Sequence, residues 1–185
     1  HPGTTLYFPK GIYELKDKEA IALETKVLNG EMGENPEKVS YTPYYPYVKG
    51  LDFTGAKQVT VLADQAILLC EGWMEPISLD QCEDVTVKGI TIDYKRKPFV
   101  SGDIVEITSD YFDVQFGEDK IVTEKMPLTR MTFWDKEKNR LYPEPIYFPK
   151  RELLGGNKVR FYHSLPQTLK GSNATAIGSD GETAV

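Results

Sequence analysis

Five residues near the middle of the chain have side chains that suit the binding of a sugar, and they are Trp73, Glu75, Asp93, Tyr94 and Arg96. The two aromatic rings offer flat apolar faces, which match the C–H surface of a sugar ring. The two carboxylates and the guanidinium offer directional hydrogen bonds to hydroxyl groups. Because Glu75 and Asp93 are predicted at strand ends, we expect them to be exposed. The sequence therefore predicts a substrate-binding site for a carbohydrate.

Each of these candidates also has a structural interpretation. Asp93 and Arg96 could instead form an ion pair that fixes the junction to the following domain. Trp73 could cap the edge of a stack of strands. Asp80 and Asp84 suit turns better than catalysis. Glycosidic hydrolysis by inversion needs two carboxylates about 6.5–9.5 Å apart, and the sequence selects no such pair, so the catalytic residues stay unknown.

The elements that would position these residues contain a repeat. The segments KQVTVLA (57–63) and EDVTVKG (83–89) match, and their valines lie about 26 residues apart, roughly one coil of a parallel β-solenoid. Strict alternation places apolar residues on one face. We therefore predict stacked parallel strands over 1–102, and the predicted core residues are Val59, Val61, Val85, Val87, Ile90 and Ile92.

The pattern changes after Gly102. Residues 103–166 contain longer alternating segments separated by turns, which predicts a separate small antiparallel β domain. Residues 167–185 are rich in Gly, Ser and Thr and are predicted to be a linker or the start of a return to the stacked strands. Near the N-terminus, residues 16–25 are expected to form one helical turn or an irregular arm. The fold class predicted is all-β.

Composition excludes several classes of function. The 185 residues carry a net charge of −6 and the pI is about 5.1, which argues against nucleic acid as the main partner. The sequence has no apolar run long enough for a transmembrane helix. Cys70 and Cys82 are either a disulfide or redox pair or two small core residues. The two histidines, His1 and His163, form no ligand cluster, so we expect no metal and no cofactor.

Two stretches resemble a known family of carbohydrate-active enzymes. GTTLYFPKGIYEL, which ends at Leu15, is similar to the opening of carbohydrate-active right-handed β-helices. The run from Met74 to Gly102 resembles glycoside hydrolase family 110, whose members carry an IDY-x-RP-x-x-S-x-G segment. Here that segment runs from Ile92 to Gly102, with Lys97 inserted between the Arg and the Pro. The family comprises bacterial exo-acting α-1,3-galactosidases, many from gut Bacteroides-type organisms.

The resemblance implies a right-handed parallel β-helix with an inserted small β-barrel-like domain. It implies release of terminal α-linked galactose or a related sugar, an oligosaccharide or polysaccharide partner, and a secreted, periplasmic or cell-surface location. In the family the catalytic acids lie on coils after the inserted domain. We therefore expect them beyond Val185 and expect the 185-residue chain to be inactive alone. The alternative is a non-catalytic β-helix module for glycan binding or surface adhesion.

Overall fold

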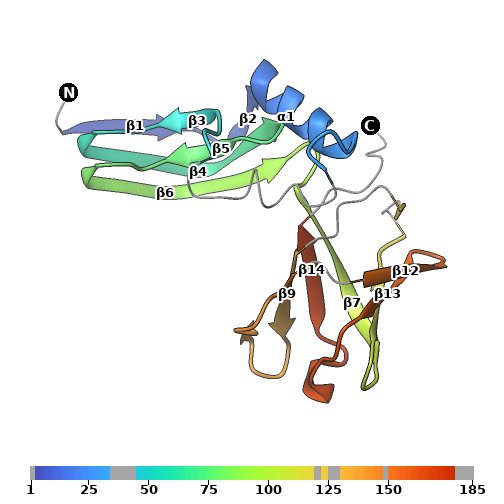
Figure 1. Cartoon of the computed structure of the whole chain (residues 1–185). Helices are drawn as coiled ribbons and strands as arrows, with labels where there is room; N and C mark the ends of the chain where they lie inside the picture. The colour runs from blue at the N-terminus through green and yellow to red at the C-terminus, as the bar shows by residue number, and fades with distance from the viewer. Residues whose placement is uncertain (1–2, 34–44, 119–121, 125–129, 148–149, 178–185) are drawn as a thin grey trace. The chain divides into compact units, whose positions relative to one another are not determined.

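The structure is a computed structural model that describes residues 3–33, 45–118, 122–124, 130–147 and 150–177. The chain divides into two compact units, one of residues 1–25 and 46–95 and one of residues 26–45 and 96–185. Strands dominate both units (Figure 1), so the all-β prediction is confirmed. No helix in the described ranges has the length and apolar character needed to cross a membrane.

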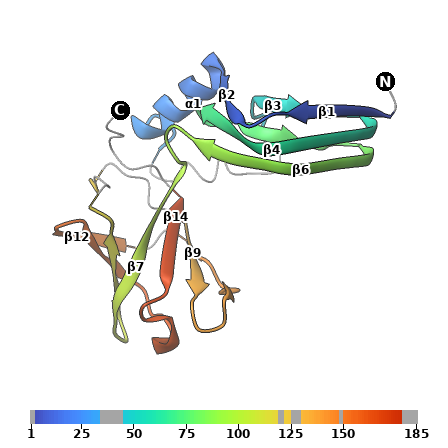
Figure 2. The ribbon, with the colours of Figure 1, turned by 180° about the vertical axis from the view of Figure 1, so that it is seen from behind.

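The strands of the first unit pair in parallel. The larger sheet contains β1 (Thr4–Phe8), β2 (Gly11–Lys16), β4 (Lys57–Glu71) and β6 (Glu83–Tyr94). The smaller sheet contains β3 (Lys49–Asp52) and β5 (Glu75–Ser78). Strands β1, β4 and β6 run side by side in both views (Figures 1 and 2). The parallel pairing predicted for this part of the chain is therefore present.

The register between these strands has a constant offset over its first part. Val59 lies opposite Val85 and Lys49 lies opposite Glu75, which are 26 positions apart in both sheets. An irregularity in β4 between Leu62 and Ala66 shortens the offset, so that Ala66 pairs with Ile90. Since paired residues of a parallel ladder share a face, this register decides which side chains stack in columns.

The same backbone conformation occurs at the start of three of these strands. Gly3, Gln58 and Asp84 have φ angles of 77°, 54° and 56°. Gly3 stands just before β1, and Gln58 and Asp84 are the second residues of β4 and β6, one residue before the Val59–Val85 pair. The amide of Gly3 donates to the carbonyl oxygen of Gln58 over 2.8 Å. This left-handed conformation costs a residue with a Cβ about 1–2 kcal/mol, so the stacked register must compensate for it at Gln58 and Asp84.

Burial in the first unit agrees only partly with the predicted core. Val61 is buried, together with Ala66, Leu68 and Cys70 on the same strand. Val59, Val85, Val87 and Ile90 are half-buried. Ile92 is 45% exposed, so the prediction that it lies in the core is wrong. Ile92 belongs to β6, which pairs with β4 on one side and has no second strand partner among the described residues.

The helix α1 (Lys18–Leu28) is longer than the single turn predicted for this region. Asp17 caps its start, because its Oδ1 accepts hydrogen bonds from the amides of Glu19 at 2.7 Å and Ala20 at 3.2 Å. Ala20, Leu23 and Val27 are buried at helical spacing. The aspartate cap and the apolar stripe therefore explain the full helix. The sequence analysis did not predict it because the segment is rich in charged residues.

The second unit is an antiparallel sheet of eight strands. They are β7 (Phe99–Ile107), β8 (Phe112–Phe116), β9 (Arg130–Asp135), β10 (Arg140–Leu141), β11 (Ile146–Tyr147), β12 (Lys150–Gly155), β13 (Lys158–Tyr162) and β14 (Asn173–Ile177), with a 3-10 turn η1 at Gln167–Leu169. The order along the sheet is β10-β9-β14-β7-β8-β13-β12, and β11 also pairs with β9. Phenylalanines 112, 116, 133 and 161 fill its core.

Two features of this unit differ from the sequence-based expectations. The sheet does not close into a barrel within the described strands, because β10 and β12 stand at opposite ends of the strand order. In addition, Asn173–Ile177 form β14, which pairs with both β7 and β9, where the sequence suggested a linker. Alternating buried Ala174 and Ala176 explain this strand, since small side chains fit a crowded sheet centre. Residues 178–185 of the predicted linker lie outside the described residues, and the division into domains at 102 and 166 stays a prediction.

Substitution of Gly89 by Ala should strongly destabilise the first unit. Gly89 has a φ of 81°, and an added Cβ would overlap the main-chain oxygen of Ala63. Gly55 is the matched control, because its φ is 72° but no atom lies within 4 Å of an added Cβ. We expect Gly55→Ala to cost about 1 kcal/mol and Gly89→Ala at least about 2 kcal/mol more. Urea denaturation followed by tryptophan fluorescence in a Trp134→Phe background, which leaves Trp73 as the reporter, measures both losses. Equal losses would contradict the close packing of β4 and β6.

Candidate functional site

Trp73 is directed into the protein. Its side chain is 3% exposed, and its amide donates to the carbonyl of Ala20 over 3.0 Å. The preceding residue, Gly72, has a φ of 89° and lies against the backbone of Ala20 and Ile21 so closely that a Cβ would overlap it. This tight approach turns Trp73 inward. In the described structure the indole ring therefore offers no exposed face to a sugar.

Tyr94 has a similar structural setting. It is half-buried beside Cys70 and Met74, and its hydroxyl donates to the carbonyl oxygen of Met74 over 2.9 Å. Burial raises the pKa of the Tyr94 phenol well above its ordinary value, with smaller contributions from Cys70 and Tyr47. Cys70 is also buried, which agrees with the core interpretation of that residue. Tyr94 thus ties the end of β6 to the turn that precedes β5.

Asp93 and Glu75 occupy different positions. Asp93 is half-buried, and its Oδ1 accepts from the amide of Tyr94 over 2.9 Å. In the register Asp93 lies opposite Leu69, which in turn lies opposite Glu14. Glu75 is exposed at the start of β5, with its amide donating to the carbonyl of Val48 over 2.9 Å. Glu75 is therefore more exposed than either aromatic residue, whereas Asp93 is half-buried like Tyr94.

Next to Asp93, four charged residues form an ion-pair chain across the ends of β2, β4 and β6. The Lys16 ammonium lies 2.6 Å from Glu71, and Lys95 lies 2.9 Å from Glu71 and 3.5 Å from Glu14. These hydrogen bonds, first from Lys16 and then from Lys95, lower the pKa of the Glu71 carboxyl. The bond to Glu71, followed by the charge of Glu14, raises the pKa of Lys95 against the effect of desolvation.

This group, together with Asp93, is the strand-end charge cluster: Glu14, Lys16, Glu71, Asp93 and Lys95. It offers both donors and acceptors, which hydroxyl groups require; Glu14, Lys16 and Lys95 are exposed, and Glu71 and Asp93 are half-buried. Sequence reasoning selected Asp93 as a site residue, noted the cation Lys95 beside it, and missed Glu14, Lys16 and Glu71. These residues could have been found only from the register of β2 and β6 against β4, which requires a correct prediction that β2 pairs with β4. Within the described ranges no group of His, Cys, Asp and Glu could hold a metal ion.

Arg96, the fifth predicted residue, begins the second unit, where it is half-buried. The structure therefore does not assemble the five predicted residues into one exposed patch. It buries Trp73, half-buries Tyr94, and separates Glu75 on the smaller sheet from Asp93 on the larger one. Whether any of them binds a sugar stays a prediction.

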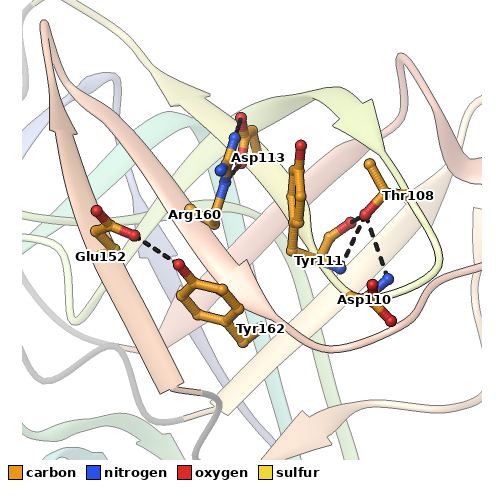
Figure 3. A network of polar contacts seen from close by, with 7 residues as sticks. All are labelled: Thr108, Asp110, Tyr111, Asp113, Glu152, Arg160 and Tyr162. Carbon is orange, nitrogen blue, oxygen red and sulfur yellow. Dashed lines mark hydrogen bonds and ion pairs between the residues drawn. The ribbon is translucent and has the colours of Figure 1, made fainter.

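A second polar network, which sequence reasoning missed, lies on the β8–β13–β12 part of the second unit (Figure 3). Arg160 donates to both carboxylate oxygens of Asp113, over 2.8 and 3.0 Å. The Arg160 guanidinium also lies 3.6 Å from the ring centre of Tyr111. The hydrogen bond to Asp113, opposed by desolvation, raises the pKa of Arg160. Since the Asp113 side chain is only 3% exposed, Arg160 is the group that compensates its buried charge.

The hairpin between β7 and β8 orients this network. Thr108 Oγ1 accepts from the amides of Asp110 and Tyr111 over 3.2 and 3.1 Å and donates to the Tyr111 carbonyl over 3.1 Å. These bonds define a tight turn that fixes the Tyr111 backbone, and Figure 3 shows the Tyr111 ring beside Arg160. The turn therefore positions the Tyr111 ring against the Arg160 guanidinium, which also donates to both oxygens of Asp113.

Replacement of Tyr94 by Phe should destabilise the first unit by about 1 kcal/mol, because the hydroxyl leaves a carbonyl of buried Met74 without that donor. Tyr13→Phe is the matched control. The Tyr13 hydroxyl donates to Pro9 over 3.0 Å at an exposed position, so its loss should change stability by less than about 0.5 kcal/mol. Urea denaturation followed by tryptophan fluorescence in a Trp134→Phe background compares the two variants. Equal effects would show that Tyr94 is not a structural tie.

Replacement of Arg160 by Met should cost about 3 kcal/mol, because it leaves the Asp113 carboxylate buried without its ion-pair partner. The double variant Asp113→Asn with Arg160→Met should recover at least half of that loss. Lys136→Met is the control, since Lys136 and Asp103 form an exposed pair at 2.9 Å whose loss should cost less than about 1 kcal/mol. Urea denaturation followed by circular dichroism decides; a loss for Arg160→Met no larger than the control would contradict the assignment.

Comparison with known proteins gives one informative similarity. No family model matches the chain. The chain is 25% identical over 115 residues to alpha-1,3-galactosidase B of Bacteroides thetaiotaomicron, which is 62% of this chain and 17% of that protein. The chain thus spans only a small part of the length of that relative. The similarity supports a relationship to glycoside hydrolases and leaves the specific family open.

Proposed function

We propose that this chain is part of a carbohydrate-active enzyme, an exo-acting glycoside hydrolase that releases terminal α-linked galactose or a related sugar from glycans. The observation that carries the proposal is the similarity to an alpha-1,3-galactosidase over 115 residues. It agrees with the sequence motifs that resemble glycoside hydrolase family 110. A relative's activity is a property of the relative, so for this chain it is a hypothesis that requires a direct test.

The fold supports the same proposal. Parallel strands pair at the same offset of 26 residues in one sheet and in the first part of β4 with β6 in the other, and such pairing is what successive coils of a right-handed parallel β-helix require. We propose that the first unit is a set of such coils and that the antiparallel second unit is a domain inserted after them. β-helices host lyases, hydrolases and adhesins alike, so the fold alone does not select the reaction.

Within the first unit, the sugar contact is best placed at the strand-end charge cluster. Trp73 is buried and Tyr94 is engaged with Met74. In the cluster, Glu14, Lys16 and Lys95 are exposed, and Glu71 and Asp93 are half-buried. We propose that Asp93 and Glu71 accept hydrogen bonds from sugar hydroxyls while Lys95 donates. A glycan as the substrate also makes a secreted, periplasmic or cell-surface location the natural proposal.

The test is titration of the isotopically labelled 185-residue chain with an α-1,3-linked galactose disaccharide, followed by backbone amide shifts. We expect shifts at the ends of β2, β4 and β6, and an affinity about tenfold weaker for Asp93→Asn, which corresponds to about 1.4 kcal/mol. Glu83→Gln is the control, because Glu83 is exposed at the start of β6 and pairs with Lys57 at 2.8 Å. No shift at the strand ends, or equal affinities for both variants, would overturn the site.

Hydrolysis of an aryl α-galactoside by the same chain tests whether this chain carries a catalytic carboxylate. We assign no acid–base pair to the described residues, so we expect no turnover that depends on Asp93. Turnover that Asp93→Asn abolishes would place a catalytic carboxylate in this chain and contradict that expectation. If the parent protein also binds the disaccharide without hydrolysing it, the chain belongs to a non-catalytic glycan-binding module.

A further inference from the structure

The C-terminal end of α1 leads into Asn29, which is the only asparagine in the sequence that is followed by a glycine, Gly30. In an Asn–Gly pair the peptide nitrogen can attack the preceding side-chain amide with least hindrance, because glycine has no Cβ. Asn29 and Gly30 are both exposed. They belong neither to the strand-end charge cluster nor to the Asp113–Arg160 network. The pair is therefore open to water, which is the only other reactant that this chemistry needs.

The reaction at such a pair is deamidation through a cyclic imide. The Gly30 nitrogen forms a bond with Cγ of Asn29, the bond from Cγ to Nδ2 breaks, and the Gly30 amide proton leaves with the departing ammonia. Water then adds to either carbonyl of the succinimide ring and opens it, which gives aspartate or isoaspartate at position 29. The balance is one water consumed and one ammonia released, with no change of oxidation state.

The folded end of α1 engages both reacting groups. The Gly30 amide donates to the carbonyl oxygen of Val27 over 3.0 Å, and Gly30 has a φ of 75°. The Glu31 amide donates to the carbonyl oxygen of Lys26 over 2.9 Å. These two bonds form a Schellman motif, named here the Schellman cap. The Asn29 side-chain amide also donates from Nδ2 to Glu31 Oε1 over 3.2 Å, so the nucleophile and the leaving group are both occupied in hydrogen bonds.

The Schellman cap can open without unfolding of the rest of the protein. Val27 is buried, whereas Lys26, Asn29 and Gly30 are exposed. Segments with few buried contacts open at a lower free energy than the whole domain. We propose that Asn29 is a site of spontaneous deamidation whose rate is limited by local opening of the Schellman cap. This inference does not depend on the proposed function.

The product weakens the cap that delays its formation. A carboxylate at position 29 cannot donate to Glu31 and repels it instead. It also places negative charge at the C-terminal, negative end of the helix dipole. Isoaspartate in addition inserts a carbon atom into the main chain before Gly30, which disrupts the register of the two cap bonds. Deamidation therefore adds one negative charge to the chain and loosens the end of α1.

The test is incubation of the 185-residue chain at mildly alkaline pH, followed by peptide mapping with mass spectrometry. Asn139 is the internal control, because it is an exposed turn residue with a φ of 48° but is followed by Arg140. We expect Asn29 to react at least about tenfold faster than Asn139, and in concentrated urea Gly30→Ala should remove most of that difference, because a Cβ hinders the attack. A rate at Asn29 no higher than at Asn139 would overturn the site.

Two variants distinguish local opening from global unfolding. Val27→Ala weakens the last turn of α1, and Val159→Ala is the matched control, since both valines are buried and Val159 belongs to the core of the antiparallel sheet. In native buffer Val27→Ala should accelerate deamidation several-fold and Val159→Ala should leave it unchanged. In concentrated urea neither should differ from wild type. Equal acceleration by both variants, or equal wild-type rates in native buffer and in urea, would overturn the role of the cap.

Amide hydrogen exchange keeps the test decisive if Val27→Ala does not fold. In the wild-type chain the amides of Gly30 and Glu31 should exchange faster than that of Leu68, which is buried in β4. Asn29→Asp, which has one of the two products, should speed exchange at both cap amides several-fold, and Asn139→Asp should not. Exchange at Gly30 as slow as at Leu68, or no effect of Asn29→Asp, would contradict the proposal.

Discussion

The parallel register of β4 with its neighbours is the constraint on which the first unit depends. β4 pairs with β1 and β2 on one side and with β6 on the other, so one strand fixes the columns of three successive levels. The buried positions Val61 and Leu68 of β4 and the charged column that includes Glu71 follow from the same alignment. A shift of one residue would exchange these faces, and the close approach of Gly89 to Ala63 opposes such a shift.

The second unit is stabilised by an aromatic core and a buried ion pair rather than by stacked parallel strands. Its core is aromatic, with Phe112 stacked on Phe161 at 5.3 Å and edge-on to Phe133 at 5.9 Å. On the other face of the same strands a buried carboxylate requires Arg160, and the ring of Tyr111 covers the guanidinium. An ion pair of this kind adds little net stability but makes each partner costly to remove.

The structure divides the aromatic and the charged sugar-binding candidates into separate roles. Trp73 is buried in the first unit. The hydroxyl of Tyr94 donates a hydrogen bond to the carbonyl oxygen of Met74. Charged residues at the strand ends remain accessible because a parallel sheet brings the ends of neighbouring strands to one edge. Recognition at that edge would therefore depend on hydrogen bonds rather than on stacking.

The sequence by itself determined the strand-rich class, the matching segments around Val59 and Val85, and the change of pattern near Gly102, because alternation and turn residues are local signals. It could not place Trp73, whose burial is decided by the contact of Gly72 with Ala20, far away in the chain. The sequence also could not predict that Glu14, Glu71 and Lys95 form ion pairs, because these residues come close only when β2 and β6 pair with β4. The exposure of Ile92 and the formation of β14 were also not predictable from the sequence. Ile92 is exposed because β6 is an edge strand among the described residues, and β14 forms because it pairs between β7 and β9.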